Sequence, residues 1–358
     1  MFIIISILSI IVGLSLLIII HELGHFCAAK WSGLLVEEFG IGFPPRIWAW
    51  RPKRWIKENG TLRQVQGETE YSFNWLPFGG FVRIYGERAG DERVDIPQSR
   101  SFAHQSVWRR MYIVGAGVLM NFMLGWLLIS AVFAIGLPRS LVVTDVVDSG
   151  IAESAGIQKS DQLIGFESVT ALTDFLNKNK GIAVPLTVKR NGGEIIITVT
   201  PRVEVPEGEG NLGILLVEMG LERQGIFGSL WEGMQTALQM VWLTILGFVD
   251  LVIGIVTDAS VFDKFVGPVG IVNVAIETTR LGFVHFLQLL GIISINLAVF
   301  NLIPIPALDG GRMFFLWIEK LRGKALDPKI EMTTNGIGFA LLMLLIAVIT
   351  VKDILTLL

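Results

Sequence analysis

The residues best suited to catalysis stand near the start of the chain, in the sequence His21-Glu22-Leu23-Gly24-His25. Two histidines four residues apart lie on one face of a helix, so both imidazoles can bind one metal ion. Glu22 lies too far around the helix to be a convenient third ligand, but it can reach an attacking water and act as a general base. This spacing is typical of zinc hydrolases.

A long apolar stretch, Phe2 to Ile20, runs into this motif without a turn signal. Its length predicts a membrane-spanning helix over residues 1–31. Two histidines and a glutamate at membrane depth are costly unless they bind or do something. The alternative is a helix that ends at Ile20 and a solvated polar cap. The apolar residues at 26–29 favour the continuous helix, in which Lys30 is the first side chain able to snorkel.

The composition places the chain among polytopic membrane proteins, because 52% of its 358 residues are hydrophobic and only 17% are charged. A net charge of -3 gives no support to nucleic-acid binding. The single cysteine, Cys27, excludes internal disulfides and cysteine-rich metal sites. The N-terminus has no basic n-region and no small-residue cleavage site, so we expect a retained helix and not a removed signal peptide.

An open catalytic zinc site needs at least one further protein ligand, and Asp309 is the candidate. It follows Pro304 and Pro306, which break a helix where irregular backbone must line an enclosed cavity. Asp309 follows the apolar run that begins at residue 283, and a helix of that length would be about 35 Å long. If the run begins at the outer face of the membrane, Asp309 lies at the depth of the two histidines. The alternative is an Asp-Gly turn, but depth and the prolines favour a ligand. Two other histidines are expected to be structural: His104 and His285.

The elements that position these residues alternate between apolar runs and polar stretches. Four apolar runs predict about four transmembrane helices, at residues 1–31, 111–137, 283–318 and 337–358. The fold class is therefore a polytopic α-helical membrane protein. Positive charge concentrates in residues 32–110 and in the loop at 319–336, which the positive-inside rule places in the cytoplasm. The N-terminus is then outside and the metal site lies toward the cytoplasmic side.

Between the first two helices, residues 32–110 predict a membrane-associated β region. The stretches at 36–50 and 70–86 are rich in aromatic and β-branched residues, with Gly and Pro at turns, as in strands and hairpins at a membrane surface. A polar, flexible loop is expected at 86–100. The hairpin is either purely structural or an exposed edge strand that pairs with an extended substrate.

Residues 138–205 predict a soluble α+β domain on the outer side. Strands at 142–147, 185–190 and 194–200 surround an amphipathic helix at 170–179, with a tight turn at Asn191-Gly192-Gly193. This order resembles one PDZ domain, a module that binds peptide ends by strand addition. A spacer that only restricts access is the alternative.

The stretch at 206–282 is predicted to be a linker with an amphipathic helix at 225–256 that lies on or dips into the outer interface. If that helix crossed the membrane, the basic loop at 319–336 would lie outside, against the positive-inside rule.

A peptide bond in a transmembrane helix is shielded by its own hydrogen bonds, so a substrate must be unwound before attack. The Gly79-Gly80 region could hold the unwound backbone by strand pairing. Three amides could hold it by hydrogen bonding: Asn121, Asn296 and Asn301.

Together these motifs resemble the site-2 protease family of intramembrane zinc metalloproteases, most closely the regulator-of-sigma-E protease type. The resemblance covers nearly the whole chain and includes HELGH at 21–25, Gly117-x-x-x-Asn121, Gly267-Pro268-Val269-Gly270 and NxxPxPxLDG at 301–310. It implies Zn2+ held by His21, His25 and Asp309, with Glu22 as the base. It also implies that the hairpin at 73–83 pairs with substrate and that further residues handle it: Asn296, Asn301, Pro304 and Pro306.

The resemblance further implies cleavage of single-pass membrane proteins in the bacterial cytoplasmic membrane, usually after another protease has trimmed them outside. Family substrates include anti-sigma factors and signal-peptide remnants, and the PDZ region would act as a size filter. The chain departs in having one PDZ module where some relatives have two, and Val118 where relatives often have proline. Two other functions remain alternatives, a catalytically silent PDZ scaffold in the membrane and a metal transporter.

Overall fold

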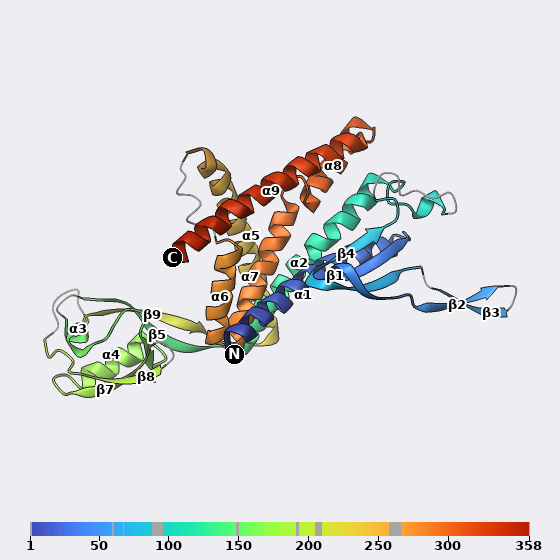
Figure 1. Ribbon diagram of the computed structural model, residues 1–358. Helices are drawn as coiled ribbons and strands as arrows, with labels where there is room; N and C mark the ends of the chain where they lie inside the picture. Colours follow the sequence, from blue (N-terminus) through green and yellow to red (C-terminus); the bar gives the residue numbers. More distant parts are fainter. Residues whose placement is uncertain are drawn as a thin grey trace. The chain divides into compact units, whose positions relative to one another are not determined.

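The computed structural model describes residues 2–58, 61–66, 68–87, 96–147, 150–190, 193–204, 210–257 and 266–357. The chain divides into two compact units, one formed by residues 1–131 and 230–358 and the other by residues 132–229. The first unit contains the long apolar helices, and the second is built on a five-stranded sheet (Figure 1).

Five helices in the described part of the chain are long and apolar enough to cross a membrane: α1 (Phe2–Trp31), α2 (Val107–Ile135), α5 (Ile226–Thr257), α7 (Phe283–Leu302) and α9 (Pro328–Leu357). Two shorter helices accompany them, α6 (Pro268–Leu281) and α8 (Asp309–Arg322). The sequence predicted about four crossings, and that number is wrong. The difference is α5, which we had expected at the membrane interface over 225–256.

The direction of α5 follows from its contacts at two levels. Near its start, the Leu230 carbonyl accepts a hydrogen bond of 3.0 Å from the Trp126 indole, in the last third of α2. Farther along, Thr244 lies 2.7 Å from the Asn296 side chain, in the second half of α7. Between residues 230 and 244, helix α5 therefore runs antiparallel to α2 and parallel to α7.

The interfacial position expected for residues 225–256 did not take account of α6. This helix packs Ala275 against Ile10 and Leu17 in the N-terminal half of α1, and only Gly282 separates it from α7. It thus brings the chain back to the level at which α7 begins.

The β region contains β1 (Val36–Trp50), β2 (Lys53–Glu58), β3 (Thr61–Gln66) and β4 (Glu70–Ile84), so both aromatic stretches form strands. Strands β1 and β4 are bent, because Phe39 pairs with both Tyr71 and Val82, while Trp48 pairs with Phe73. Segments 70–73 and 80–83 of β4 therefore flank residues 38–41 of β1. Of the expected loop at 86–100, residues 88–95 lie outside the described residues; a short 3-10 helix forms at Gln98–Arg100.

Large aromatic side chains point outward from the bent strands. Their exposed fractions range from 45% to 69%, which is unusual for a protein that faces only water. Aromatic residues are enriched where a protein meets the membrane–water interface, so this surface agrees with a membrane-associated location. The residues are Phe43, Trp48, Trp50, Phe73 and Trp75.

The 132–229 unit contains β5 (Leu137–Val146), α3 (Ile151–Ala155), β6 (Gln162–Ile164), α4 (Val169–Lys178), β7 (Val184–Arg190), β8 (Gly193–Val199) and β9 (Ile214–Leu221). The sheet order is β8-β7-β6-β5-β9 and every pair is antiparallel. Helix α4 buries Leu172 and Leu176 against the sheet, and Ser168 caps it by accepting from the Ala171 N–H at 3.1 Å. Strand β9 lies beyond residue 205, where the sequence had ended the domain. The expected turn residues Asn191 and Gly192 lie outside the described residues.

Candidate metal centre

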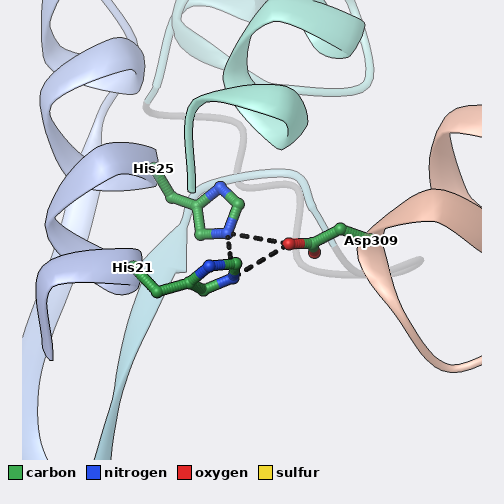
Figure 2. Close-up of side chains that lie close together, drawn as sticks. All are labelled: His21, His25 and Asp309. Atoms are coloured by element: carbon green, nitrogen blue, oxygen red, sulfur yellow. Dashed lines mark hydrogen bonds and ion pairs between the residues drawn. The ribbon is translucent and has the colours of Figure 1, made fainter. Parts of the chain in front are cut away.

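The two histidines of α1 and the aspartate of α8 meet at one point, as Figure 2 shows. Asp309 Oδ2 lies 2.9 Å from His21 Nε2 and 3.3 Å from His25 Nε2, and the two Nε2 atoms are 3.1 Å apart. Across the described part of the chain, this is the one group of three or more His, Cys, Asp or Glu residues close enough to share a metal ion.

Glycines bring α2 close enough to α1 to enclose the imidazoles. A Cβ built on Gly24, between the two histidines, would lie 2.4 Å from the carbonyl oxygen of Ala116. A Cβ on Gly117 would lie 2.4 Å from His25 Nε2 and 2.9 Å from His21 Cε1. The backbones of α1 and α2 are therefore in contact here. The two imidazoles occupy the space that a side chain at position 117 would need.

The outer nitrogen of each imidazole faces α2. His25 Nδ1 lies 2.9 Å from the Ile113 carbonyl, which can only accept, so this nitrogen carries the proton. A neutral His25 then presents a lone pair at Nε2. His21 Nδ1 lies 3.3 Å from the side-chain amide of Asn121. Partners of this kind fix the tautomer and ring orientation of ligating histidines.

The backbone break before α8 sets the position of Asp309. The chain leaves α7 at Leu302 and turns through residues 303–308, where Ala307 has a φ of +78° and donates its N–H to Asn335 Oδ1 at 3.0 Å. A Cβ on Gly310 would lie 2.2 Å from the Ile303 carbonyl oxygen, so α8 begins in contact with the turn. Asp309 stands in the first turn of α8, where the N-terminal end of the helix dipole favours a carboxylate.

Two ion pairs hold α8 to its neighbours. Arg110 of α2 pairs with Glu319, and Arg312 donates to Glu87, which follows β4, at 2.5 Å. A cavity of about 350 Å³ adjoins both pairs. Neither pair could be read from the sequence, because 209 and 225 residues separate the partners.

The donor set fits a divalent cation. His21 Nε2, His25 Nε2 and Asp309 Oδ2 point at one another. Asp309 Oδ2 is buried and has no hydrogen bond of good geometry among the described residues. Lone pairs that converge in this way are repulsive unless a proton or a cation lies between them. Tetrahedral zinc ligands at about 2.0–2.1 Å would be roughly 3.3 Å apart, close to the spacings found here. Imidazole and carboxylate are also ligands that zinc accepts.

The strand β4 passes beside the glutamate of the motif. A Cβ on Gly80 would lie 3.7 Å from Glu22 Cγ, and a Cβ on Gly79 would lie 3.4 Å from Ile18 of the same helix. Residues 80–84 pair with β1 on one side. In the described residues no strand pairs with their other side, so the backbone groups of this β4 edge have no strand partner.

The remaining predicted substrate residues do not all lie in one place. Asn296 contacts Thr244 of α5, and Asn301 is in the last turn of α7. Pro304 is exposed, whereas Pro306 packs against α9, where a Cβ on Gly338 would lie 2.6 Å from its carbonyl oxygen. The sequence analysis missed Thr244 as a partner because a threonine in an apolar helix ordinarily bonds to its own backbone.

A pair of histidines on an apolar helix, an aspartate at a helix break and a glutamate beside the pair define the class of membrane-embedded metallopeptidases. Residues 9–345 match the profile of peptidase family M50, and the chain belongs to this family, the site-2 proteases. It is a zinc metalloendopeptidase and a multi-pass membrane protein.

Curated relatives match the chain over almost its whole length. A candidate zinc metalloprotease of Clostridium perfringens, CPE1693, is 34% identical over 96% of this chain and 97% of the relative. The zinc metalloprotease RasP of Geobacillus kaustophilus is 28% identical over 98% and 97%. The regulator of sigma-W protease RasP of Bacillus subtilis is 27% identical over 98% of both chains.

Proposed function

We propose that this protein is an intramembrane endopeptidase that cleaves single-pass membrane proteins after another protease has trimmed them outside the membrane. The observation that carries the proposal is the convergence of His21, His25 and Asp309 beside Glu22 and the open edge of β4. Anti-sigma factors and signal-peptide remnants are the proposed substrates. The name of the Bacillus subtilis relative, a regulator of sigma-W protease, supports the first class.

In the proposed mechanism, His21, His25 and Asp309 hold the metal. Zinc, when bound, supplies an activated water and polarises the scissile carbonyl. Glu22 takes the proton from the attacking water and passes it to the leaving amine. The carbonyl of Ile113 keeps the proton of His25 on Nδ1, so that Nε2 faces the metal.

The open edge of β4 is proposed to hold the substrate in extended form. Residues 80–84 offer backbone groups beside Glu22, and strand addition satisfies the backbone of an unwound peptide. Glycines at 79 and 80 let this segment pack closely against β1 and α1, since a Cβ on Gly80 would lie 2.9 Å from the Gly40 carbonyl oxygen. Further contacts to the unwound backbone are assigned to Asn296, Asn301 and the Pro304 to Pro306 segment.

We further propose that the protein resides in the bacterial cytoplasmic membrane, with the N-terminus outside and the metal site toward the cytoplasm. The basic residues of 32–110 and of 319–336 support this orientation. The 132–229 unit would then lie outside. There it would act as a PDZ-like filter that excludes substrates with large outer domains or captures the new ends of trimmed ones.

The test is cleavage of a membrane-anchored reporter whose outer domain is already removed. Wild type, Glu22→Gln and Asp309→Asn are purified and reconstituted, and bound zinc is measured in each. We expect cleavage by wild type only, with zinc retained in Glu22→Gln and reduced in Asp309→Asn. Equal cleavage by Glu22→Gln and wild type would overturn the general-base assignment, and full zinc content in Asp309→Asn would overturn the third ligand.

The two alternatives make different demands on the molecule. A catalytically silent scaffold is disfavoured by membership of a peptidase family. A metal transporter needs a path of polar ligands, and one cluster of metal-binding geometry occurs in the described part of the chain. Zinc uptake into liposomes that contain the protein would nevertheless favour the transporter over the peptidase.

A further inference from the structure

We infer that Asn121 is a positioning residue that selects the metal-binding tautomer of His21, and not the substrate-binding amide that the sequence indicated. The inference rests on the proposed zinc site. It concerns the side of His21 that faces away from the metal, where the ring nitrogen Nδ1 meets the amide of α2.

Burial excludes an easy approach of substrate to this amide. Asn121 is 1% exposed, and its side-chain nitrogen lies 3.3 Å from His21 Nδ1. Its Oδ1 is buried and has no hydrogen-bond partner among the described residues. A buried amide oxygen without a partner is costly, so this atom calls for a donor.

The backbone around Asn121 is fixed against α7. The Ser294 hydroxyl donates to the Asn121 carbonyl at 2.7 Å. One turn later, a Cβ on Gly125 would lie 2.5 Å from Ile295 Cγ1 and 3.0 Å from the Gly291 carbonyl oxygen. No space for an extended peptide remains between these helices at this level, so the amide serves the imidazole beside it.

The two orientations of the amide select different tautomers of His21. With Nδ2 toward the ring, the amide donates to Nδ1, and the ring proton moves to Nε2, the atom that faces Asp309 and His25. With the amide turned by half a revolution, Oδ1 accepts from an Nδ1–H, and Nε2 is left with a lone pair for the metal. The oxygen and nitrogen of an amide occupy interchangeable positions, so both orientations fit the same space.

The second orientation gives both histidines the same arrangement. His25 already donates its Nδ1–H to the Ile113 carbonyl at 2.9 Å, and His21 would donate to Asn121 Oδ1 in the same way. Metal-ligating histidines almost always donate their other ring N–H to an oxygen of this kind, and loss of the acceptor typically costs about 10–100-fold in metal affinity.

The experiment measures zinc affinity by competition with a chelator in the full-length protein, without substrate. The variants are Asn121→Leu, which keeps the size but removes the acceptor, and Asn121→Asp, which keeps an acceptor oxygen. Asn296→Leu removes an amide from the neighbouring helix and is the matched control. We expect zinc affinity about 10–100-fold weaker in Asn121→Leu, and close to wild type in Asn121→Asp and Asn296→Leu.

The visible absorption of the cobalt-substituted protein gives a second readout, because it reports the ligand geometry directly. It should change in Asn121→Leu and be restored in Asn121→Asp. If Asn121→Leu does not fold, as judged by helicity and thermal unfolding, Asn121→Ala carries the same expectation.

Wild-type zinc affinity and an unchanged cobalt spectrum in the folded Leu or Ala variant would overturn the inference, and a raised KM in that variant would return Asn121 to substrate binding. Zinc binding by a His25→Ala variant shows whether such a result concerns only Asn121 or the proposed metal site as a whole. If His25→Ala also retains zinc, the metal site itself is wrongly placed; if it loses zinc, only the role of Asn121 is wrong.

Discussion

Gly117 of α2 and His25 of α1 occupy adjoining space at the metal centre, so that a Cβ on the glycine would lie 2.4 Å from His25 Nε2. Real Cβ atoms do not approach so closely, and the atom that would have to move is the one that faces Asp309 at 3.3 Å. The packing of α1 against α2 and the geometry of the candidate metal ligands therefore depend on the same contact.

Gly117→Ala should therefore displace the His25 imidazole. Overpacking of this kind costs about 1–3 kcal/mol, and an error of about 1 Å in a catalytic group can reduce the rate roughly 100-fold. We expect cleavage of the trimmed reporter to fall by about two orders of magnitude, together with weaker zinc binding. Activity and zinc content of the purified variant measure both effects.

Gly115→Ala is the matched control, two residues earlier on the same helix. A Cβ there would meet only the flexible Met313 side chain, at 3.7 Å from its terminal methyl group, which is ordinary contact. We expect near wild-type zinc binding and cleavage. If both variants behave alike, the effect belongs to general helix packing and not to the histidine.

A second prediction concerns the contact between α5 and the candidate substrate amide of α7. Thr244 Oγ1 lies 2.7 Å from the Asn296 side chain and 2.8 Å from the Met240 carbonyl. If Asn296 holds the unwound substrate, this threonine competes for the same amide. Thr244→Val should lower KM by about 2- to 10-fold, since one hydrogen bond contributes about 0.5–1.5 kcal/mol.

Thr257→Val provides the comparison on the same helix, because its hydroxyl bonds to the Ile253 carbonyl one turn before it, at 3.0 Å. It should leave KM unchanged. An unchanged KM in Thr244→Val, at full expression and helicity, would mean that Asn296 does not contact substrate in the rate-limiting complex.

The sequence predicted the elements that carry His21, His25 and Asp309 better than the path of the chain between them. The apolar run before His21 and the prolines before Asp309 each carry a strong local signal, and the structure brings these residues to one point. Helix α6 carries none, because its 14 residues are too few to stand out in a hydropathy window. Without α6, the charge pattern favoured an interfacial α5, whereas the length and composition of α5 fit a membrane span.

The sharp bends of β1 and β4 were also beyond local reasoning. Alternation and aromatic content predict two strands, but not that Phe39 pairs with both Tyr71 and Val82. Register in a bent sheet depends on the neighbours that each segment meets after the bend. For the same reason the sequence could not place the Asn121 amide beside His21 Nδ1, because only tertiary packing brings these two side chains together.

A third prediction concerns pH and the 132–229 unit. Burial alone would raise the pKa of the Asp161 carboxyl, but the guanidinium of Arg190, at 2.7 Å, and the N–H of Gln158, at 2.9 Å, hold the pKa below its ordinary value. A carboxylate whose pKa is lowered by folding stabilises the folded state above its unfolded pKa, near 3.9. That stability is lost as pH falls through the lower, folded value.

Asp161→Asn should therefore destabilise this unit at neutral pH and weaken the pH dependence of its stability below about pH 4. Hydrogen exchange of the β7 amides in the full-length protein, corrected for the intrinsic rate at each pH, measures both effects. Asp145→Asn is the control, since Asp145 is exposed and accepts from the adjacent Val146 N–H at 3.1 Å. Equal protection in Asp161→Asn and wild type at neutral pH would show that the Arg190 pair adds no net stability. A buried ion pair has that outcome when the cost of desolvating both charges matches their attraction.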